Sequence, residues 1–247
     1  MHSIHLRTRH MVRLILITLF LMIPANVAEQ NRQAQTAWQS SRAQRSEKGD
    51  SISRPTSEPY KGDLSIFEDE KRAERLQINR VMDLLNIKEG SSVADIGAGS
   101  GWFTVRAASR VGTGGAVFAV EINPEYIAHI RERASREGLA NIRTVLGKED
   151  DPMLAPSSVE AVLMLKTYHE IAEPIRLLAN LRAAMKPGAL LGIIDRDGDG
   201  GDHGIDSSTV IEEAARAGFE KVEQYDFVKP DGMDYFLILR ARRDGRD

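Results

Sequence analysis

The feature that most constrains this chain is a run of alternate glycines that follows an apolar stretch. Residues 93–104 read VADIGAGSGWFT, with Gly97, Gly99 and Gly101 at every second position after Asp95. The apolar residues before the acid predict a buried strand, and the apolar spacing after the glycines predicts a helix. A strand that enters a helix through glycines brings bare backbone to the carboxyl edge of an open α/β sheet, where nucleotides bind. The stretch therefore predicts an α/β fold with a nucleotide site.

Two classes of nucleotide compete for this turn. A dinucleotide fold requires G-x-G-x-x-G, whose third glycine lets the helix pack closely on the sheet beside a pyrophosphate. Here Trp102 stands at the place of that third glycine, and Asp95 precedes the turn. An acid at this place favours a cationic or neutral ligand over a pyrophosphate. An NAD(P)-dependent oxidoreductase remains the alternative on this pattern alone.

The segment DIGAGSG at 95–101 resembles the first motif of the class I S-adenosylmethionine (SAM)-dependent methyltransferases. In that family the glycine turn lies against the amino-acid part of SAM, which carries a sulfonium and an ammonium rather than phosphates. The resemblance implies SAM as the cofactor and methyl transfer as the activity. The cofactor contacts that it implies in this stretch are Asp95, Gly97, Ala98, Gly99 and Gly101.

A second apolar run, residues 116–120, predicts a buried strand that ends at Glu121, 24 residues after Gly97. In a βαβ unit an acid at this tip accepts hydrogen bonds from the ribose hydroxyls. The position suits SAM and NAD equally, so it indicates a nucleoside without deciding which. The resemblance adds the neighbouring Ile122 as a cofactor contact.

A third strand is predicted over 141–146 and is followed by a hydrophilic loop. In the family that the chain resembles, an acid after this strand accepts a hydrogen bond from the adenine amino group. The resemblance assigns that role to Asp150 first and to Glu149 second. An ordinary exposed loop has the same composition.

A fourth strand is predicted over 159–165, and Lys166, Tyr168 and His169 follow it. The resemblance places the end of this strand beside the methyl group, and a Tyr-His pair there resembles a subset of small-molecule methyltransferases. An aromatic face attracts a sulfonium, and a neutral imidazole accepts a proton near neutral pH. Tyr168 and His169 are therefore the predicted catalytic residues, with Lys166 as a cofactor contact. The alternative is that His169 caps a helix and that Tyr168 is only part of the wall of the site.

The apolar patterns in the rest of the chain predict the remaining helix and strands of the fold. A helix over 68–85 precedes the first strand, a fifth strand spans 190–194, and two strands at 222–228 and 234–242 are separated by a short turn and so antiparallel. We expect an α/β, Rossmann-like three-layer sandwich whose seven-stranded, mostly parallel sheet ends in an antiparallel β-hairpin. The glycine- and aspartate-rich loop over 196–205 is predicted to be a flexible lid from which His203 reaches substrate.

Composition limits the chemistry. The 247 residues carry a formal net charge of −3, so no basic field predicts a nucleic-acid partner. The sequence has no cysteine, which excludes disulfides, thiolate metal sites and cysteine nucleophiles. The 196–205 loop fails the calcium-loop pattern, because glycines stand at ligand positions. No metal site is predicted.

The chain divides into three predicted regions. Residues 1–28 combine arginines, an apolar core of about ten residues and small residues afterwards, as in a signal peptide or membrane anchor. Residues 29–63 are polar and predict a disordered linker, and residues 64–247 form the methyltransferase domain. We therefore expect export or anchoring, with possible N-terminal membrane contact. A start at Met11 or later that removes a functional signal would leave the product cytoplasmic.

The sequence thus predicts a SAM-dependent methyltransferase that acts on a small-molecule acceptor. A non-catalytic SAM-binding module and an NAD(P)-dependent oxidoreductase are the alternatives. Export conflicts with the cytoplasmic supply of SAM.

Overall fold

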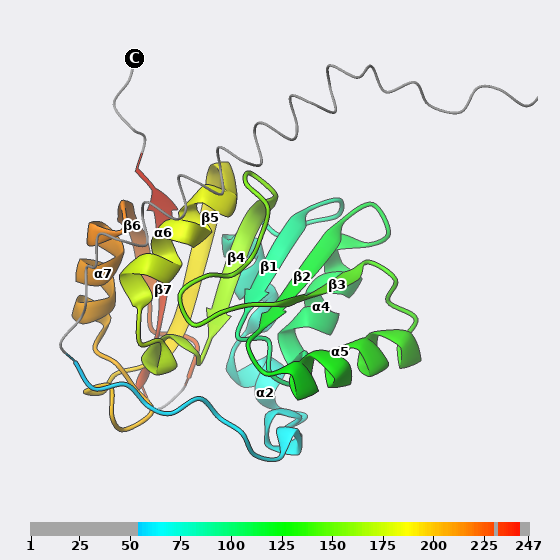
Figure 1. The fold of residues 1–247 in the computed structure, drawn as a ribbon, viewed down its shortest axis with the longest axis horizontal. Coiled ribbons are helices and arrows are strands. Elements are labelled where there is room, and N and C mark those ends of the chain that lie inside the picture. Colours follow the sequence, from blue (N-terminus) through cyan, green and yellow to red (C-terminus); the bar gives the residue numbers. More distant parts are fainter. Residues whose placement is uncertain (1–53, 230–231, 243–247) are drawn as a thin grey trace, which may run out of the picture. The chain divides into compact units, whose positions relative to one another are not determined.

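A computed structural model describes residues 54–229 and 232–242 (Figure 1). The predicted signal segment and residues 29–53 of the predicted linker lie outside the described residues. Within the described ranges, no helix has both the length and the apolar character needed to cross a membrane.

The described strands form one seven-stranded sheet in the order β3-β2-β1-β4-β5-β7-β6. Strands β1 to β5 pair in parallel, and β7 lies antiparallel between β5 and β6. This confirms the predicted fold class, including the terminal hairpin. The strands are β1 Ser92–Ile96, β2 Ala116–Glu121, β3 Ile142–Leu146, β4 Val159–Leu165, β5 Met185–Arg196, β6 Phe219–Tyr225 and β7 Asp234–Ala241.

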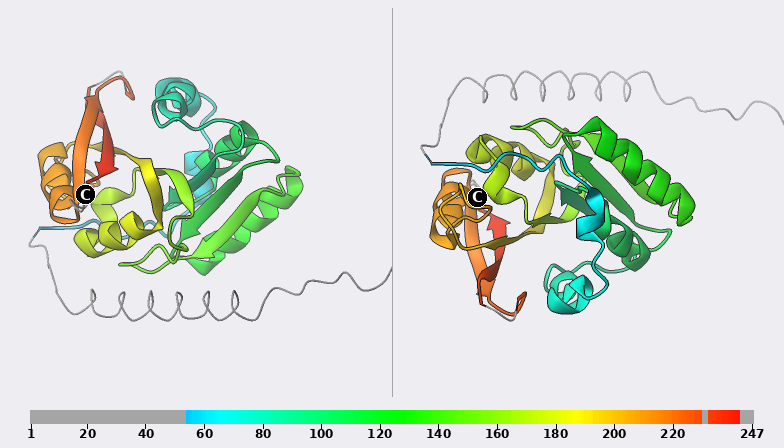
Figure 2. Two further views of the ribbon diagram at one scale, coloured as in Figure 1. Left: turned by 90° about the horizontal axis from the view of Figure 1, so that it is seen from above. Right: turned by 90° about the horizontal axis from the view of Figure 1, so that it is seen from below.

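Helices cover both faces of the sheet (Figure 2). Helices α3 and α4 share one apolar cluster with Val93 and Val117, whereas α6 and α7 share another with Ala94 and Val162. Adjacent residues of a strand point to opposite faces, so the two clusters are the two sides of one sheet. The helices are η1 Leu64–Phe67, α2 Arg72–Arg75, α3 Ile78–Leu84, α4 Trp102–Val111, α5 Pro124–Arg136, η2 Tyr168–Glu170, α6 Pro174–Ala184 and α7 Ser207–Arg216.

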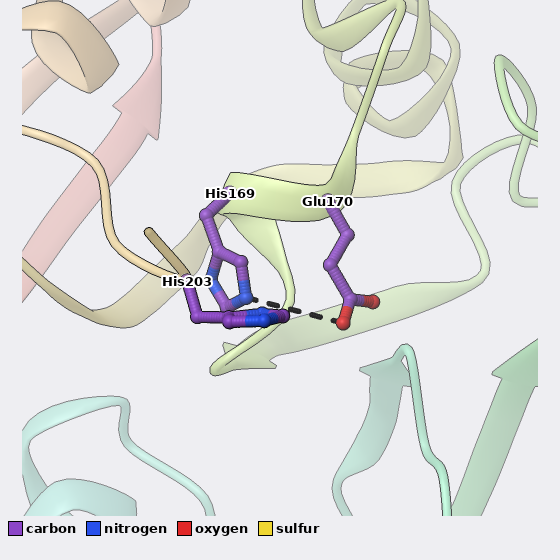
Figure 3. A group of neighbouring side chains, drawn as sticks. All are labelled: His169, Glu170 and His203. Atoms are coloured by element: carbon purple, nitrogen blue, oxygen red, sulfur yellow. Dashed lines mark ion pairs between the residues drawn. The ribbon is translucent and has the colours of Figure 1, made fainter. Parts of the chain in front are cut away.

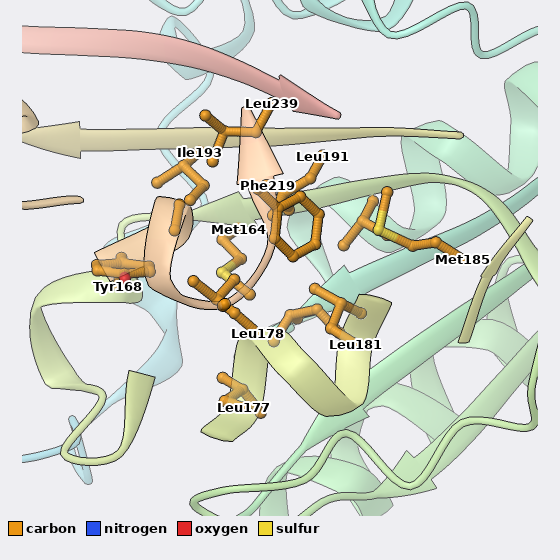
Figure 4. Packing of buried hydrophobic residues seen from close by; sticks show 14 of the residues in the cluster. Met164, Tyr168, Leu177, Leu178, Leu181, Met185, Leu191, Ile193, Phe219 and Leu239 are labelled. Atoms are coloured by element: carbon orange, nitrogen blue, oxygen red, sulfur yellow. The ribbon is translucent and has the colours of Figure 1, made fainter. Parts of the chain in front are cut away.

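The apolar face under α6 and α7 is the larger of the two clusters (Figure 4). Leu178 and Leu181, three residues apart on α6, pack toward Phe219 at the start of β6, and all three are fully buried. Burying a side chain of this size contributes about 1.5–3 kcal/mol. This packing holds α6 against the sheet where β6 begins.

The predicted helix over 68–85 is two helices rather than one. Gln77 has φ +46° and separates α2 from α3. Its side chain donates a hydrogen bond from Nε2 to the carbonyl of Phe227. A non-glycine residue in the left-handed region ends an α-helix, and apolar spacing alone does not reveal such a break.

The predicted linker extends too far, because its last ten residues pack on the domain. Arg54 donates from Nε to Glu213 at 2.8 Å, and Ser57 is buried with its hydroxyl bonded to the Gly200 carbonyl at 3.0 Å. We call residues 54–61 the strap. It crosses beneath the carboxyl ends of the strands in Figure 1. The domain therefore includes the strap, and the boundary lies before residue 64.

Candidate functional site

One cavity of about 710 Å³ lies at the carboxyl edge of β1, β2 and β4. Its walls are the glycine turn, the tip of β2, the loop after β3, the segment after β4, and the strap. The residues at these places that carry the argument are Asp95, Gly99, Glu121, Glu149, Thr167 and Glu170. This is the edge at which open α/β sheets bind ligands.

The glycine turn exposes backbone without side chains to the cavity, but its backbone N–H groups already donate hydrogen bonds within the protein. The N–H groups of Gly97 and Ala98 both donate to the carbonyl of Val120, and that of Gly99 donates to Glu121 Oε2 at 3.0 Å. Gly99 has φ +52°, and a Cβ placed there would meet nothing within 4 Å. The turn therefore leaves an open cradle above Gly99.

Gly101 differs from the other glycines of the turn. It is the N-cap of α4 with φ +75°, and its N–H donates to the Ala98 carbonyl. It is not among the residues that line the cavity. Its cofactor contact stays a prediction, and its structural role is to permit the turn into the helix, because a left-handed residue is required there.

Asp95 is a buried carboxyl group in the cavity wall, with 2% of its surface exposed. It accepts a hydrogen bond from the Thr104 hydroxyl at 2.6 Å. Burial raises the pKa of Asp95 to about 7, and the nearby Glu121 carboxyl adds to this while Thr104 and Arg72 oppose it. A cationic ligand group beside Asp95 would favour its ionised form.

Trp102, at the place where a dinucleotide fold needs glycine, is buried between two arginines. The guanidinium carbon of Arg72 lies 4.5 Å and that of Arg106 lies 3.9 Å from the ring centroid. Burial lowers the pKa of Arg72 to about 10. Arg72 also lines the cavity, so the indole holds a cation near Asp95.

Glu121, at the tip of β2, is oriented by three backbone donors. Its Oε1 accepts from the N–H groups of Ile122 at 2.7 Å and Asn123 at 3.0 Å, and its Oε2 accepts from Gly99. A carboxylate has about four acceptor positions, so Oε2 retains one for a ligand hydroxyl. Ile122 lines the cavity beside it, as predicted.

The loop after β3 reverses the predicted order of its two acids. Glu149 lines the cavity, whereas Asp150 forms an ion pair with Arg176 at 2.7 Å and is not part of the lining. Two adjacent acids in an irregular loop point in different directions, and composition does not tell which one faces the ligand. Asp150, the first choice for the adenine contact, is therefore replaced by Glu149.

Lys166 lines the cavity, but its charge is already paired. Its Nζ lies 2.5 Å from Oδ1 of the buried Asp234, which begins β7. The residue has φ +58° at the end of β4. A cofactor contact from Lys166 is therefore limited to its backbone and aliphatic stem.

The two predicted catalytic residues do not face the cavity. Tyr168 is fully buried in the cluster beneath α6 and α7, and its hydroxyl bonds to Glu213 at 2.9 Å. His169 is 4% exposed and bonds through Nδ1 to Asp195. Neither lines the cavity, so Tyr168 cannot pack on a sulfonium and His169 cannot reach an acceptor directly. The short η2 turn directs Thr167 and Glu170 toward the cavity instead.

Glu170 is the polar residue that the sequence pattern missed. It is half-buried, lines the cavity, and accepts a hydrogen bond from the Tyr60 N–H of the strap at 3.3 Å. Burial raises the pKa of Glu170 to about 7. The signal available in the sequence was its position directly after the Tyr-His pair.

The 196–205 loop, predicted to be a free lid, is tied to the strap. Ser57 donates its hydroxyl to the Gly200 carbonyl and accepts the N–H of His203 at 3.0 Å. Its own N–H donates to the His169 carbonyl. His203 therefore lies beside His169 and Glu170, although its side chain is exposed (Figure 3).

The residues present fit a nucleoside ligand with a cationic tail. The cradle above Gly99 admits a group that any side chain would displace, and Glu121 keeps an acceptor position for a ribose hydroxyl. Asp95 supplies negative charge, and Glu149 supplies an acceptor on the opposite wall. These residues do not offer a cluster of N–H donors for a phosphate, because the N–H groups of Gly97, Ala98 and Gly99 already donate hydrogen bonds within the protein.

Fold and site together define an α/β protein with a nucleoside site at the carboxyl edge of its sheet. A sequence model of the family described as methyltransferase domain matches residues 93–188, from β1 to the start of β5. The chain belongs to the class I SAM-dependent methyltransferases, and SAM is the cofactor of that family.

Individual relatives agree on the family and differ in substrate. A solved structure of a SAM-dependent methyltransferase from Aquifex aeolicus is 25% identical with a TM-score of 0.65, covering 72% of this chain and 98% of that one. An arsenite methyltransferase of Halobacterium salinarum is 29% identical over 43% of this chain and 27% of its own length. A protein-L-isoaspartate O-methyltransferase of Pyrococcus horikoshii is 27% identical over 45% of this chain and 47% of its own length. The chain thus spans less than half of these two curated relatives.

Proposed function

We propose that this chain transfers a methyl group from SAM to a small-molecule acceptor. The observation that carries the proposal is the cavity that extends from the glycine turn to Thr167 and Glu170 beneath the strap. Its volume of about 710 Å³ falls within the range of about 300–1,000 Å³ typical of small-molecule sites. The strap forms part of the wall, which favours a small acceptor over the surface of a macromolecule.

The roles of the residues follow from their positions in the cavity. SAM, when bound, supplies a methyl group on a sulfonium that is already a good leaving group. The protein mainly contributes alignment and exclusion of water. Glu121 and Asp95 hold the cofactor end, and Glu170 presents a carboxyl group at the acceptor end, where it can hydrogen-bond an O–H or N–H group.

Labelled methyl transfer tests the proposal. The full chain is incubated with methyl-labelled SAM and a panel of small molecules carrying hydroxyl, carboxyl, amine or thiol groups, with unfolded proteins as a separate panel. We expect transfer to a small molecule and a lower kcat in Glu170→Gln. Transfer to protein alone would contradict the small acceptor, and SAM binding without any transfer would favour the non-catalytic module.

We also propose that residues 1–28 direct the domain out of the cytoplasm or anchor it to the membrane. The arginines before the apolar run support this proposal, because positive charges stay on the cytoplasmic side. Fractionation of a chain tagged at its C-terminus tests it. A product found only in the cytosol and starting at Met11 would contradict it.

A further inference from the structure

Three chemically active side chains converge beside the cavity and have no role in binding the cofactor. One ligand atom each from His169, Glu170 and His203 lies within 4.8 Å of the others. Figure 3 shows the three side chains pointing toward one another, two from η2 and one from the 196–205 loop. His203 lies 33 residues after Glu170 in the sequence, so no local motif reveals the group.

The orientation of His169 is fixed by a buried carboxylate. Asp195, with no exposed surface, accepts from His169 Nδ1 at 2.9 Å, from the backbone N–H of His169 at 3.1 Å and from that of Arg196 at 2.9 Å. A carboxylate with these partners only accepts, so Nδ1 carries the hydrogen. The lone pair is then on Nε2, on the side of Glu170. A carboxylate that orients the far nitrogen of an imidazole is the usual support of a metal-binding histidine.

The facing atoms of His169 and Glu170 leave a gap that a cation can bridge. Nε2 of His169 lies 3.9 Å from Oε1 of Glu170, and both atoms are acceptors in this tautomer. The imidazole of His203 meets that of His169 edge to face, with ring centroids 5.8 Å apart. Among the described residues, no hydrogen bond or ion pair occupies the ring nitrogens of His203. His203 can therefore turn the lone pair of one ring nitrogen toward the other two residues, and Glu170 Oε1, which accepts one hydrogen bond from the Tyr60 N–H, keeps lone-pair capacity for a cation.

We propose that His169, Glu170 and His203 form a binding site for a divalent transition-metal ion of the zinc class. Two imidazoles and one carboxylate bind such ions in preference to calcium or magnesium, which prefer ligand sets made of oxygen atoms alone. Tetrahedral bonds of about 2.0–2.1 Å require ligand atoms about 3.3 Å apart, so the side chains must approach one another slightly. Glu170 is half-buried and His203 is exposed, so neither side chain is fully enclosed by the core.

The site adjoins the acceptor end of the cavity. Glu170 is both a ligand and part of the cavity wall. Three protein ligands leave a fourth position for water or for an oxygen atom of an acceptor, as in sites where the metal takes part in chemistry. The ion binding itself does not depend on methyl transfer, so the two proposals fail separately.

Zinc titration of the full chain tests the site in the absence of SAM. The chain is stripped with a chelator and titrated calorimetrically with Zn²⁺, and Co²⁺ is added separately because its visible absorption reports the coordination geometry. We expect one tight equivalent in the wild type, with tetrahedral or five-coordinate cobalt absorption. Glu170→Gln and His203→Ala should weaken Zn²⁺ binding by at least about 100-fold, and Asp195→Asn by about 10- to 100-fold.

The controls use the other histidines of the chain. His129→Ala and the combined His2→Ala, His5→Ala and His10→Ala variant keep the proposed ligands and should retain the tight equivalent. Circular dichroism and thermal unfolding verify that each variant is folded. His203 lies on an exposed loop, so His203→Ala remains informative if a change at buried Asp195 prevents folding. Equal Zn²⁺ affinity of His203→Ala and the wild type, or no tight binding by the wild type, would overturn the inference.

Discussion

Asp95 links the stability of the protein to pH. Its pKa is about 7 in the folded state against an ordinary value of 3.8. Between these values the folded carboxyl keeps a proton that the unfolded one has lost, so the free energy of unfolding falls as the pH rises. The contribution is about 1.4 kcal/mol per pH unit and levels off above the folded pKa.

We therefore predict that Asp95→Asn removes this part of the pH dependence. Urea unfolding of the wild type and the variant from about pH 5 to about pH 8 measures it. The stability of the wild type relative to Asp95→Asn should fall toward pH 7 and then stay constant. Asp226→Asn, which replaces an exposed carboxyl, is the matched control and should keep the wild-type slope. Parallel profiles for the wild type and Asp95→Asn would contradict the account.

Glu121 is the residue whose loss should affect the cofactor most selectively. Glu121→Gln keeps the size of the side chain and removes one acceptor, so binding of S-adenosylhomocysteine should weaken by about 1–3 kcal/mol. Calorimetry measures the affinity. Glu125→Gln, at an exposed position that also lines the cavity, should bind like the wild type. Full affinity in Glu121→Gln as well would contradict the role of Glu121 in binding the ribose.

Individual residues show what the pattern predicted and what it did not. Asp95 and Glu121 lie at the carboxyl ends of the buried strands β1 and β2, and these ends meet at one edge of the sheet, so both residues line the cavity. Tyr168 and Glu149 lie in irregular segments, where the backbone turn decides which neighbour faces the ligand. The side chain of Tyr168 is turned inward by a hydroxyl bond to Glu213, 45 residues away. Such a contact has no local signal.

At the scale of elements, the glycine turn and the segment after β4 are packed against each other. A Cβ on Gly97 would lie 2.3 Å from Thr167 Cγ2, whereas one on Gly99 would meet nothing. Both glycines have positive φ. Gly99→Ala should therefore cost about 1–2 kcal/mol for its backbone alone, and Gly97→Ala should cost a further 1–3 kcal/mol or so from overpacking.

Chemical denaturation of the two variants measures this difference. Thr167→Ala removes the two nearest atoms, so it should recover part of the stability lost in Gly97→Ala and none of that lost in Gly99→Ala. Equal stabilities of Gly97→Ala and Gly99→Ala, or a double variant with no recovery, would show that the two segments are not in close contact.

Helices and strands were predicted well where their apolar pattern continues over many residues. The strands β1, β2 and β4 and the helices α5 and α6 follow continuous patterns, and packing against the sheet reinforces them. The helix before β1 was predicted as one because apolar spacing continues across Gln77, where the backbone turns. The strap was predicted as linker because it is polar, yet an ion pair to α7 and hydrogen bonds to the 196–205 loop and η2 hold it on the domain.

At the scale of the whole molecule, the sheet order and the family match describe the same unit. The parallel strands carry the nucleoside site, and the strap and the 196–205 loop close the acceptor end. A fold of this kind serves more than one reaction, so the proposed methyl transfer is tested through the site of this chain.

The most direct measurement is calorimetric titration of the full chain with SAM, S-adenosylhomocysteine and NAD under the same conditions. The account predicts that SAM and S-adenosylhomocysteine each bind at one site per chain and that NAD produces no binding heat. Binding of NAD without binding of SAM would contradict it, because the glycine turn would then be a dinucleotide site despite the buried Trp102.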